Sequence, residues 1–307
     1  MTTGTSPFAL PRGIDLHARP LRPDDAEAVV ALARADEAEW LPEPMTELVD
    51  VQRSWRAPDA DLGRRSLGLV EGDELVAYVV VGRHGRLDAV VPARLRDRGI
   101  GTALHRWARA TAAALGEREV AQTVPVGSAA EAFLVAAGAH PDFDAWVLEL
   151  PAERRLEPQP LPHGHDLGEG RTDEMTTVHR VIEDAFGEWP GRQPTTYEQW
   201  AADFLDGDEA APWRCRVVRD PDGVVVGVAM VIGSSDGMLW VDELAVRADR
   251  RGLGLARALL ADSFAEGRRR GFARSGLSTD SRTGALGLYE HVGMEVTATF
   301  RRLALSV

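Results

Sequence analysis

Lysine and asparagine do not occur in this sequence, and cysteine occurs only once, at Cys215. A single cysteine excludes an intramolecular disulfide and leaves no thiolate cluster for zinc, so we expect no metal site. All 35 basic side chains are therefore arginines, which we interpret as the codon usage of a GC-rich genome. Because residues 1–7 lack the basic flank and apolar core of a secretion signal, we expect a cytoplasmic protein.

Long apolar runs and an excess of positive charge are missing as well. The longest apolar stretch, residues 224–232, is interrupted by Gly227 and falls far short of the ~20 residues that span a bilayer, so we expect no membrane segment. The formal net charge of -13 argues against a nucleic acid partner, because phosphate binding needs a basic surface. An acidic surface suits a cationic substrate such as an amine, or serves solubility alone.

Length and proline distribution predict two domains. The chain has 307 residues, enough for two domains of ordinary size, and its composition of 44% hydrophobic and 27% charged residues is that of a globular protein. Prolines crowd between residues 151 and 162, which indicates a linker. We therefore expect an N-terminal domain at 1–150, a linker at 151–162 and a C-terminal domain at 163–307.

The most informative segment is a glycine turn at residues 251–256, which reads Arg-Gly-Leu-Gly-Leu-Ala. It follows a strand expected over 238–246 and precedes an amphipathic helix expected over 255–270. Glycines at such a turn let backbone N–H groups close on a phosphate, and the positive end of the helix dipole favours that anion. The sequence thus predicts a phosphate-binding turn.

A related segment at residues 98–103 indicates that this unit occurs twice. It reads Arg-Gly-Ile-Gly-Thr-Ala and precedes a helix expected over 101–115. Gly101 and Gly254 lie 153 positions apart, a spacing that indicates a duplicated domain and not a solenoid.

Three parts of the C-terminal half, in their order and spacing, carry a family resemblance: Leu244-Ala245-Val246, Arg251-x-x-Gly254-x-Ala256 and Leu288-Tyr289-x-x-x-Gly293. Together they resemble the GNAT superfamily of acyl-CoA N-acyltransferases. The first half matches in outline, with Arg98-x-x-Gly101-x-Ala103 and Phe133-Leu134-x-x-x-Gly138. The resemblance implies an α/β fold of two tandem GNAT domains, as in mycothiol synthases, each a mixed, splayed β-sheet flanked by helices.

The resemblance implies acetyl-CoA as co-substrate. Its diphosphate and pantetheine arm would contact the strand end, the glycine turn and one serine: Leu244, Ala245, Val246, Arg251, Gly252, Leu253, Gly254, Leu255, Ala256 and Ser281. Asparagine often stands at the serine position in the family, which weakens that assignment. A second, tentative cofactor site in the first half comprises Arg98, Gly99, Gly101 and Thr102.

The resemblance also implies the catalytic groups. Tyr289 matches the family tyrosine that protonates the departing CoA thiolate, although it could instead be a buried aromatic with its hydroxyl bonded to backbone. Many members place an acid where this chain has Trp240. Asp242 shares the strand parity of Trp240, and Glu243 points to the opposite face unless a bulge shifts it; either could act as base through water, or both could be ordinary strand-end acids.

Tryptophans are the candidates for the acceptor pocket. Trp240 and Trp189 could line it or pack in the core, and Trp200 carries the same ambiguity. In the first half, Leu134 stands where Tyr289 stands in the second, and the first glycine loop reads as longer. We therefore expect the N-terminal domain not to be catalytic.

The function expected from the sequence is acetyl-CoA-dependent N-acetylation of a small amine by the C-terminal domain. The alternatives are mycothiol synthase activity, a non-catalytic acyl-CoA-binding or regulatory protein, and a protein N-terminal acetyltransferase. The motifs do not fix the acceptor, the acyl chain or the oligomeric state, because they leave the walls of the pocket undefined.

Overall fold

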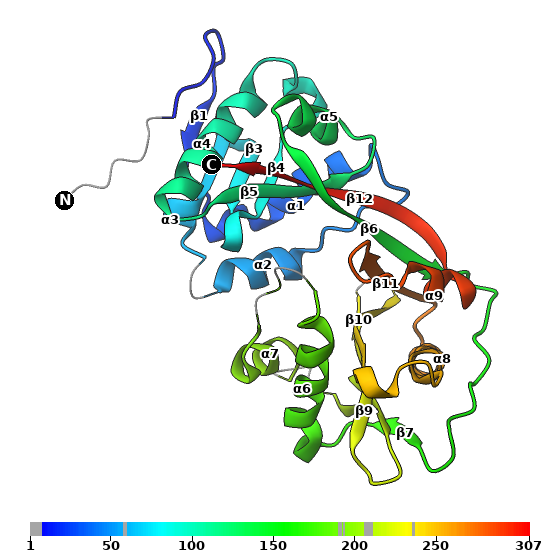
Figure 1. The fold of residues 1–307 in the computed structure, drawn as a ribbon. Helices are drawn as coiled ribbons and strands as arrows, with labels where there is room; N and C mark the ends of the chain where they lie inside the picture. Colours follow the sequence, from blue (N-terminus) through cyan, green and yellow to red (C-terminus); the bar gives the residue numbers. More distant parts are fainter. Residues whose placement is uncertain (1–7, 58–59, 190–191, 193, 206–210, 235–236) are drawn as a thin grey trace. The chain divides into compact units, whose positions relative to one another are not determined.

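The computed structural model describes residues 8–57, 60–189, 192, 194–205, 211–234 and 237–307. The chain divides into two compact units, Met1–Asp144 with Ala298–Val307 (unit 1) and Ala145–Thr297 (unit 2). Each unit is an α/β domain in which helices pack against a β-sheet (Figure 1). None of the helices in the described part of the chain is long and apolar enough to cross a membrane.

Unit 1 contains an antiparallel sheet of β1 (His17–Arg19), β2 (Ser66–Glu71), β3 (Glu74–Val81) and β4 (Leu87–Val90), paired in that order. A further antiparallel pair joins β5 (Glu119–Pro125) to the C-terminal part of β12 (Glu295–Ser306). The helices of this unit are α1 (Ala26–Glu37), α2 (Leu48–Arg56), α3 (Leu62–Arg65), α4 (Ile100–Ala114) and α5 (Ala129–Ala136).

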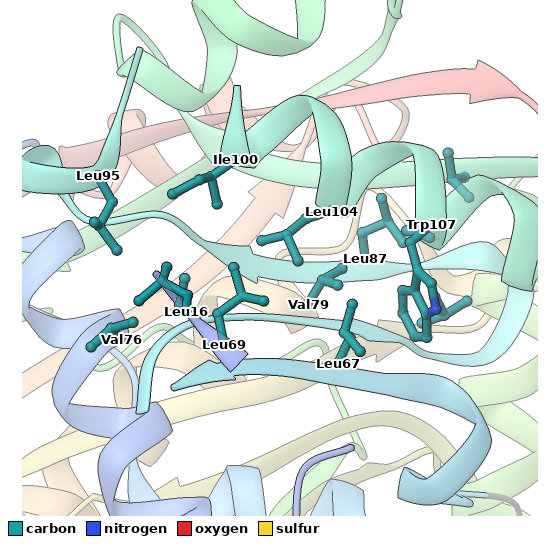
Figure 2. Packing of buried hydrophobic residues seen from close by; sticks show 14 of the residues in the cluster. Leu16, Leu67, Leu69, Val76, Val79, Leu87, Leu95, Ile100, Leu104 and Trp107 are labelled. Atoms are coloured by element: carbon teal, nitrogen blue, oxygen red, sulfur yellow. The ribbon is translucent and has the colours of Figure 1, made fainter. Parts of the chain in front are cut away.

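Helix α4 supplies much of the core of unit 1. Its apolar residues recur at helical spacing, so Ile100, Leu104 and Trp107 lie on one face and are buried. Figure 2 shows these side chains above those of the sheet, including Leu69 and Val79. Burying each side chain of this size stabilises the fold by roughly 1.5–3 kcal/mol.

Unit 2 contains a mixed sheet in the order β6-β11-β10-β9-β8-β7. Its strands are β6 (His140–Leu150), β7 (Asp166–Glu169), β8 (Cys215–Arg219), β9 (Val225–Gly233), β10 (Met238–Val246) and β11 (Arg274–Asp280). Its helices are α6 (Met175–Phe186), α7 (Tyr197–Phe204), α8 (Leu255–Arg269) and α9 (Leu286–His291). One hydrophobic cluster joins the sheet to α8 and α9, and a second joins it to α6 and α7.

The borders of the compact units differ from the domain borders expected at 150 and 163, because each unit includes a strand segment from the other expected domain. Residues 145–150 of β6 belong to unit 2, where they pair antiparallel with β11. The last ten residues of the chain belong to unit 1, where β12 pairs with β5. Residues 151–165, which include the expected linker, contain neither helix nor strand and connect β6 to β7 within unit 2.

Strands β10 and β11 diverge halfway along their length. They pair in parallel, and their register runs only from Met238 opposite Arg274 to Val241 opposite Leu277. Beyond Val241, β10 continues to Val246 with its pairing to β9 alone. One backbone edge of this strand half therefore has no strand beside it in the described sheet, and it faces the cavity described next.

Candidate active site

The glycine turn of unit 2 has the backbone that its sequence predicts. Gly252 and Gly254 have φ values of 76° and 79°, and Gly254 is the N-cap of α8. Glycine adopts this left-handed region without the steric cost that a Cβ brings. A Cβ at either position would meet nothing within 4 Å, so the turn is open on its outer side. The first N–H groups of α8 have no intrahelical acceptor and can bind an anion there.

A cavity of about 880 Å³ extends from this turn along the free edge of β10 to α9. This volume lies within the range of roughly 300–1,000 Å³ that is typical of ligand pockets. Most of the expected cofactor residues line it: Leu244, Ala245, Val246, Arg251, Gly252, Gly254, Leu255 and Ala256.

Two expected cofactor residues do not line the cavity. Leu253 lies between the two left-handed glycines, and its side chain is 44% exposed to solvent. Ser281 lies in an exposed turn after β11, whereas Asp280 and Thr283 on either side of it line the cavity. The assignment of Leu253 and Ser281 to the cofactor site therefore stays a prediction, which would rest on their backbone groups or on contacts outside this cavity.

A β-bulge decides which acid enters the site. The register between β10 and β9 shifts between Val241 and Glu243, so Asp242 is the extra residue and is exposed. Beyond the bulge, the strand parity is inverted, and Glu243 follows Ala245 toward α6 and α7. Both acids line the cavity, but only Glu243 is enclosed by protein.

The electrostatics of Glu243 are unusual for a carboxyl group. Burial raises its pKa to about 7, and the negative charge of Asp242 acts in the same direction. A hydrogen bond of 3.0 Å, donated by the indole Nε1 of Trp200 to Oε2 of Glu243, opposes that shift. A carboxyl group that is half ionised near neutral pH is suited to accept a proton from a substrate.

Tyr289, on α9, lines the same cavity. Its side chain is 7% exposed and packs in the cluster with Leu255, Leu259 and Leu277. Burial raises the pKa of its hydroxyl to about 12, so the group stays protonated at neutral pH. Within the described residues the hydroxyl has no hydrogen-bond partner, although the sequence left open that it is bonded to backbone.

The two tryptophans that are candidates for the acceptor pocket differ in their position relative to the cavity. Trp189 lines the cavity, stacks on Phe186 with a centroid distance of 4.5 Å, and has the Arg282 guanidinium 5.7 Å from its ring centroid. Trp240 does not line the cavity. Its ring packs over β11, where a Cβ on Gly276 would lie 3.2 Å from it. Of the two alternatives left open for Trp240, this position favours packing in the core over lining the acceptor pocket.

Unit 1 contains the expected repeat of the glycine turn, but its residues align with those of unit 2 at a different offset from the expected one. Gly99, with φ 78°, is the N-cap of α4, as Gly254 is of α8, so the repeat offset is 155 positions and not 153. The first motif is thus Arg96-x-x-Gly99-x-Gly101, and the two loops have equal length. Arg96 Nε donates to the Val91 carbonyl at 3.1 Å, and Arg251 Nε donates to the Val246 carbonyl at 3.2 Å.

The corresponding cleft of unit 1 is partly closed by its own residues. A Cβ on Gly99 would meet the Pro11 ring at 3.1 Å, and the Phe133 ring lies over Gly101. Gln122 Nε2 donates a hydrogen bond of 3.1 Å to the carbonyl oxygen of Ala89, on the β4 edge that corresponds to the free edge of β10. The remaining cavity has a volume of about 280 Å³. Of the four residues expected here, it is lined by Gly99, Gly101 and Thr102 but not by Arg98.

Comparisons with known proteins show which family and which solved structures this chain resembles. The profile of the acetyltransferase (GNAT) family matches residues 176–294. A GCN5-related N-acetyltransferase from Sphaerobacter thermophilus is 27% identical, with 97% of each chain covered and a TM-score of 0.80. No curated protein sequence matches the chain.

Two further solved structures share the fold. A tandem GNAT protein from the clavulanic acid biosynthesis pathway is 20% identical, with 95% of this chain and 98% of that chain covered and a TM-score of 0.72. N-myristoyltransferase of Saccharomyces cerevisiae, solved with myristoyl-CoA, is 14% identical, with 98% and 81% covered and a TM-score of 0.68. The chain therefore has the fold of tandem GNAT proteins, and its residues 176–294 match the family's acetyltransferase domain.

Proposed function

We propose that unit 2 transfers the acetyl group of acetyl-CoA to the nitrogen of a small amine, and that unit 1 is not catalytic. The observation that carries this proposal is one cavity that is lined by the open glycine turn, Glu243 and Tyr289. Unit 1 has Leu134 at the position of Tyr289, and leucine cannot donate a proton.

The binding of acetyl-CoA follows from the turn and the free strand edge. The first N–H groups of α8 receive the diphosphate, and Gly252 and Gly254 leave room for it to approach the backbone. The pantetheine arm pairs with the free edge of Leu244 to Val246 like an added strand. Acetyl-CoA, as substrate, supplies the activated acyl group next to the splayed strands.

The reaction is a direct transfer that needs one base and one acid. The amine nitrogen attacks the thioester carbonyl carbon, and its proton goes to the carboxylate of Glu243. The C–S bond breaks, and the Tyr289 hydroxyl protonates the leaving thiolate. Glu243 then loses its proton to solvent, and Tyr289 regains one from solvent. One amide and one free CoA thiol form for each acetyl-CoA used. The net charge of -13 favours the approach of a cationic amine, which loses one proton to solvent before its neutral nitrogen attacks.

The direct test is the release of CoA thiol from acetyl-CoA in the presence of a panel of small amines. The background is low because Cys215, the sole thiol of the chain, is buried and its pKa is raised to about 12 by burial. Turnover with at least one amine, with mass spectrometry identifying the N-acetyl product, supports the proposal. Tight acetyl-CoA binding without transfer across the panel contradicts it and identifies a non-catalytic binder.

Replacing Gly254 by alanine is expected to weaken acetyl-CoA binding about tenfold, because the added Cβ lies where the backbone must approach the diphosphate. Gly223→Ala is the matched control, because Gly223 has a φ of 77°, has equally open surroundings and lies in the β8–β9 turn. Calorimetry should find weaker binding in the first variant alone. Equal affinity in both variants would contradict the assignment of the turn.

A further inference from the structure

We propose that Trp200 is a positioning residue for acyl transfer, whose indole N–H fixes the Glu243 carboxyl in the place from which it removes the amine proton. This inference rests on the proposed function above, and it assigns a role to a residue outside the cavity wall. The bond from Trp200 Nε1 to Glu243 Oε2 is 3.0 Å long and connects α7 to β10.

The donor is held rigidly. Trp200 is 2% exposed, and the rings of His179, Tyr197 and Phe204 lie 5.5, 5.9 and 5.7 Å from its ring, centroid to centroid. The N-terminus of α7 is fixed by a capping box in which the side chains of Thr196 and Gln199 bond to each other's backbone N–H groups. The indole therefore cannot follow the carboxyl if that group moves, and the bond sets one orientation for Glu243.

The chemistry of the donor suits a base. An indole N–H only donates hydrogen bonds, so it can stabilise the carboxylate but cannot compete for the substrate proton. Within the described residues, Trp200 is the only hydrogen-bond partner of the Glu243 side chain. The bond engages Oε2 and leaves Oε1 available for the amine.

Other charged groups around Glu243 shift its pKa in opposite directions. Asp242 on the same strand and Glu183 on α6 disfavour the carboxylate, whereas Arg192 favours it. Cys215 on β8 is a neutral thiol, and His179 on α6 contacts the Trp200 ring while its Nε2 engages the Thr195 carbonyl. Trp200 is the neighbour that lowers the pKa of Glu243 most.

Unit 1 repeats the arrangement with different residues. Asp88 on β4 occupies the position that corresponds to Glu243 at the repeat offset of 155, and the Tyr78 hydroxyl from β3 donates a hydrogen bond of 3.0 Å to it. Burial raises the pKa of Asp88 as well. In both units, an aromatic donor holds the enclosed acid of this strand, although the donors come from different elements.

The test is the pH dependence of kcat/KM for the acceptor amine, measured between about pH 5 and pH 9 in the wild type, Trp200→Phe, Glu243→Gln and Trp213→Phe. Phenylalanine keeps an aromatic ring in the core but removes the N–H. We expect the acidic limb in Trp200→Phe to move up by about one pH unit, with activity returning toward wild type at the alkaline end. Trp213→Phe should keep the wild-type profile, because Trp213 packs on Phe272 and Arg270 outside the cavity.

Each outcome decides a different claim. An unchanged limb in Trp200→Phe, or an equal loss at every pH, overturns the positioning role while leaving the proposed function intact. If the wild type turns over but its pH profile has no acidic limb, or if the limb persists in Glu243→Gln, the proposed role of Glu243 as the base is overturned. If Trp200→Phe does not fold, the indole ¹⁵N–H resonance of Trp200 in the wild-type protein decides. It should titrate with the midpoint of the kinetic limb, and a pH-independent resonance contradicts the inference.

Discussion

Replacing Tyr289 by phenylalanine is expected to lower kcat by about 10²–10⁴-fold while the Kd for acetyl-CoA stays near that of the wild type. The phenyl ring fills the same place in the hydrophobic cluster, so the change removes only the hydroxyl. With a pKa raised to about 12, that hydroxyl is protonated at the pH of the assay and is a suitable donor to the leaving thiolate. Thiol release gives kcat, and calorimetry gives the Kd.

The matched control is Tyr78→Phe in unit 1. Tyr78 is fully buried, and its hydroxyl donates a hydrogen bond to Asp88, so the loss of this hydroxyl should lower stability more than Tyr289→Phe does. Turnover should nevertheless be retained, because the cavity proposed as the active site belongs to unit 2. A Tyr289→Phe enzyme with nearly full kcat would contradict the assignment of the acid.

Replacing Glu243 by glutamine is expected to lower kcat about 10²-fold or more and to remove the acidic limb of the pH profile. The base acts only when ionised, and its pKa is raised to about 7. The wild-type kcat/KM should therefore rise as the pH increases through about 7 and level off above it. The variant should show no such rise with the same amine, measured over the same pH range.

Two controls separate catalysis from folding. Since the folded-state pKa of Glu243 is raised, the stability it contributes is present below its ordinary pKa and is lost as the pH rises through about 7. Glutamine removes that charge, so the variant should melt no lower than the wild type at pH values well above 7. Asp88→Asn, the matched change in unit 1, should leave the kinetic profile unaltered. Retained activity in Glu243→Gln would contradict the role of the base.

Local sequence patterns predicted the parts of the site that depend on local backbone. The strand expected over 238–246 and the glycine turn after it are confirmed, because left-handed glycines before an amphipathic helix have few alternative structures. Helix α9 brings Tyr289 to the cavity, at the position that the family resemblance implied for it. In these cases the chemistry and the conformation are encoded within a few residues.

The choice between Asp242 and Glu243 could not be made from the sequence. It depends on the bulge after Val241, and a bulge is set by how β10 pairs with β9 rather than by the strand's own residues. The same holds for Trp200, which lies 43 positions from Glu243 in the sequence and meets it only through the packing of α7. Single-chain periodicity contains no information about such contacts.

The register of the repeat was mistaken for an identifiable reason. In the sequence, Gly99 and Gly101 can each be aligned with Gly254. The residue that corresponds to Gly252 is Asp97, which has a left-handed φ of 59°, and an aspartate does not indicate this conformation as a glycine does. The spacing from Leu134 to Tyr289 already equals the observed offset. Strand exchange was missed because β-strand patterns do not specify which unit a strand joins.

Titration of the intact chain with acetyl-CoA tests the central claim most directly, because it counts the sites and locates them. The account predicts one equivalent per chain, since Pro11, Phe133 and Gln122 partly close the cleft of unit 1 and leave a cavity of only about 280 Å³. The affinity should fall about tenfold in Gly254→Ala and remain unchanged in Gly99→Ala. Two equivalents, or a single equivalent that Gly99→Ala weakens and Gly254→Ala does not, would contradict it.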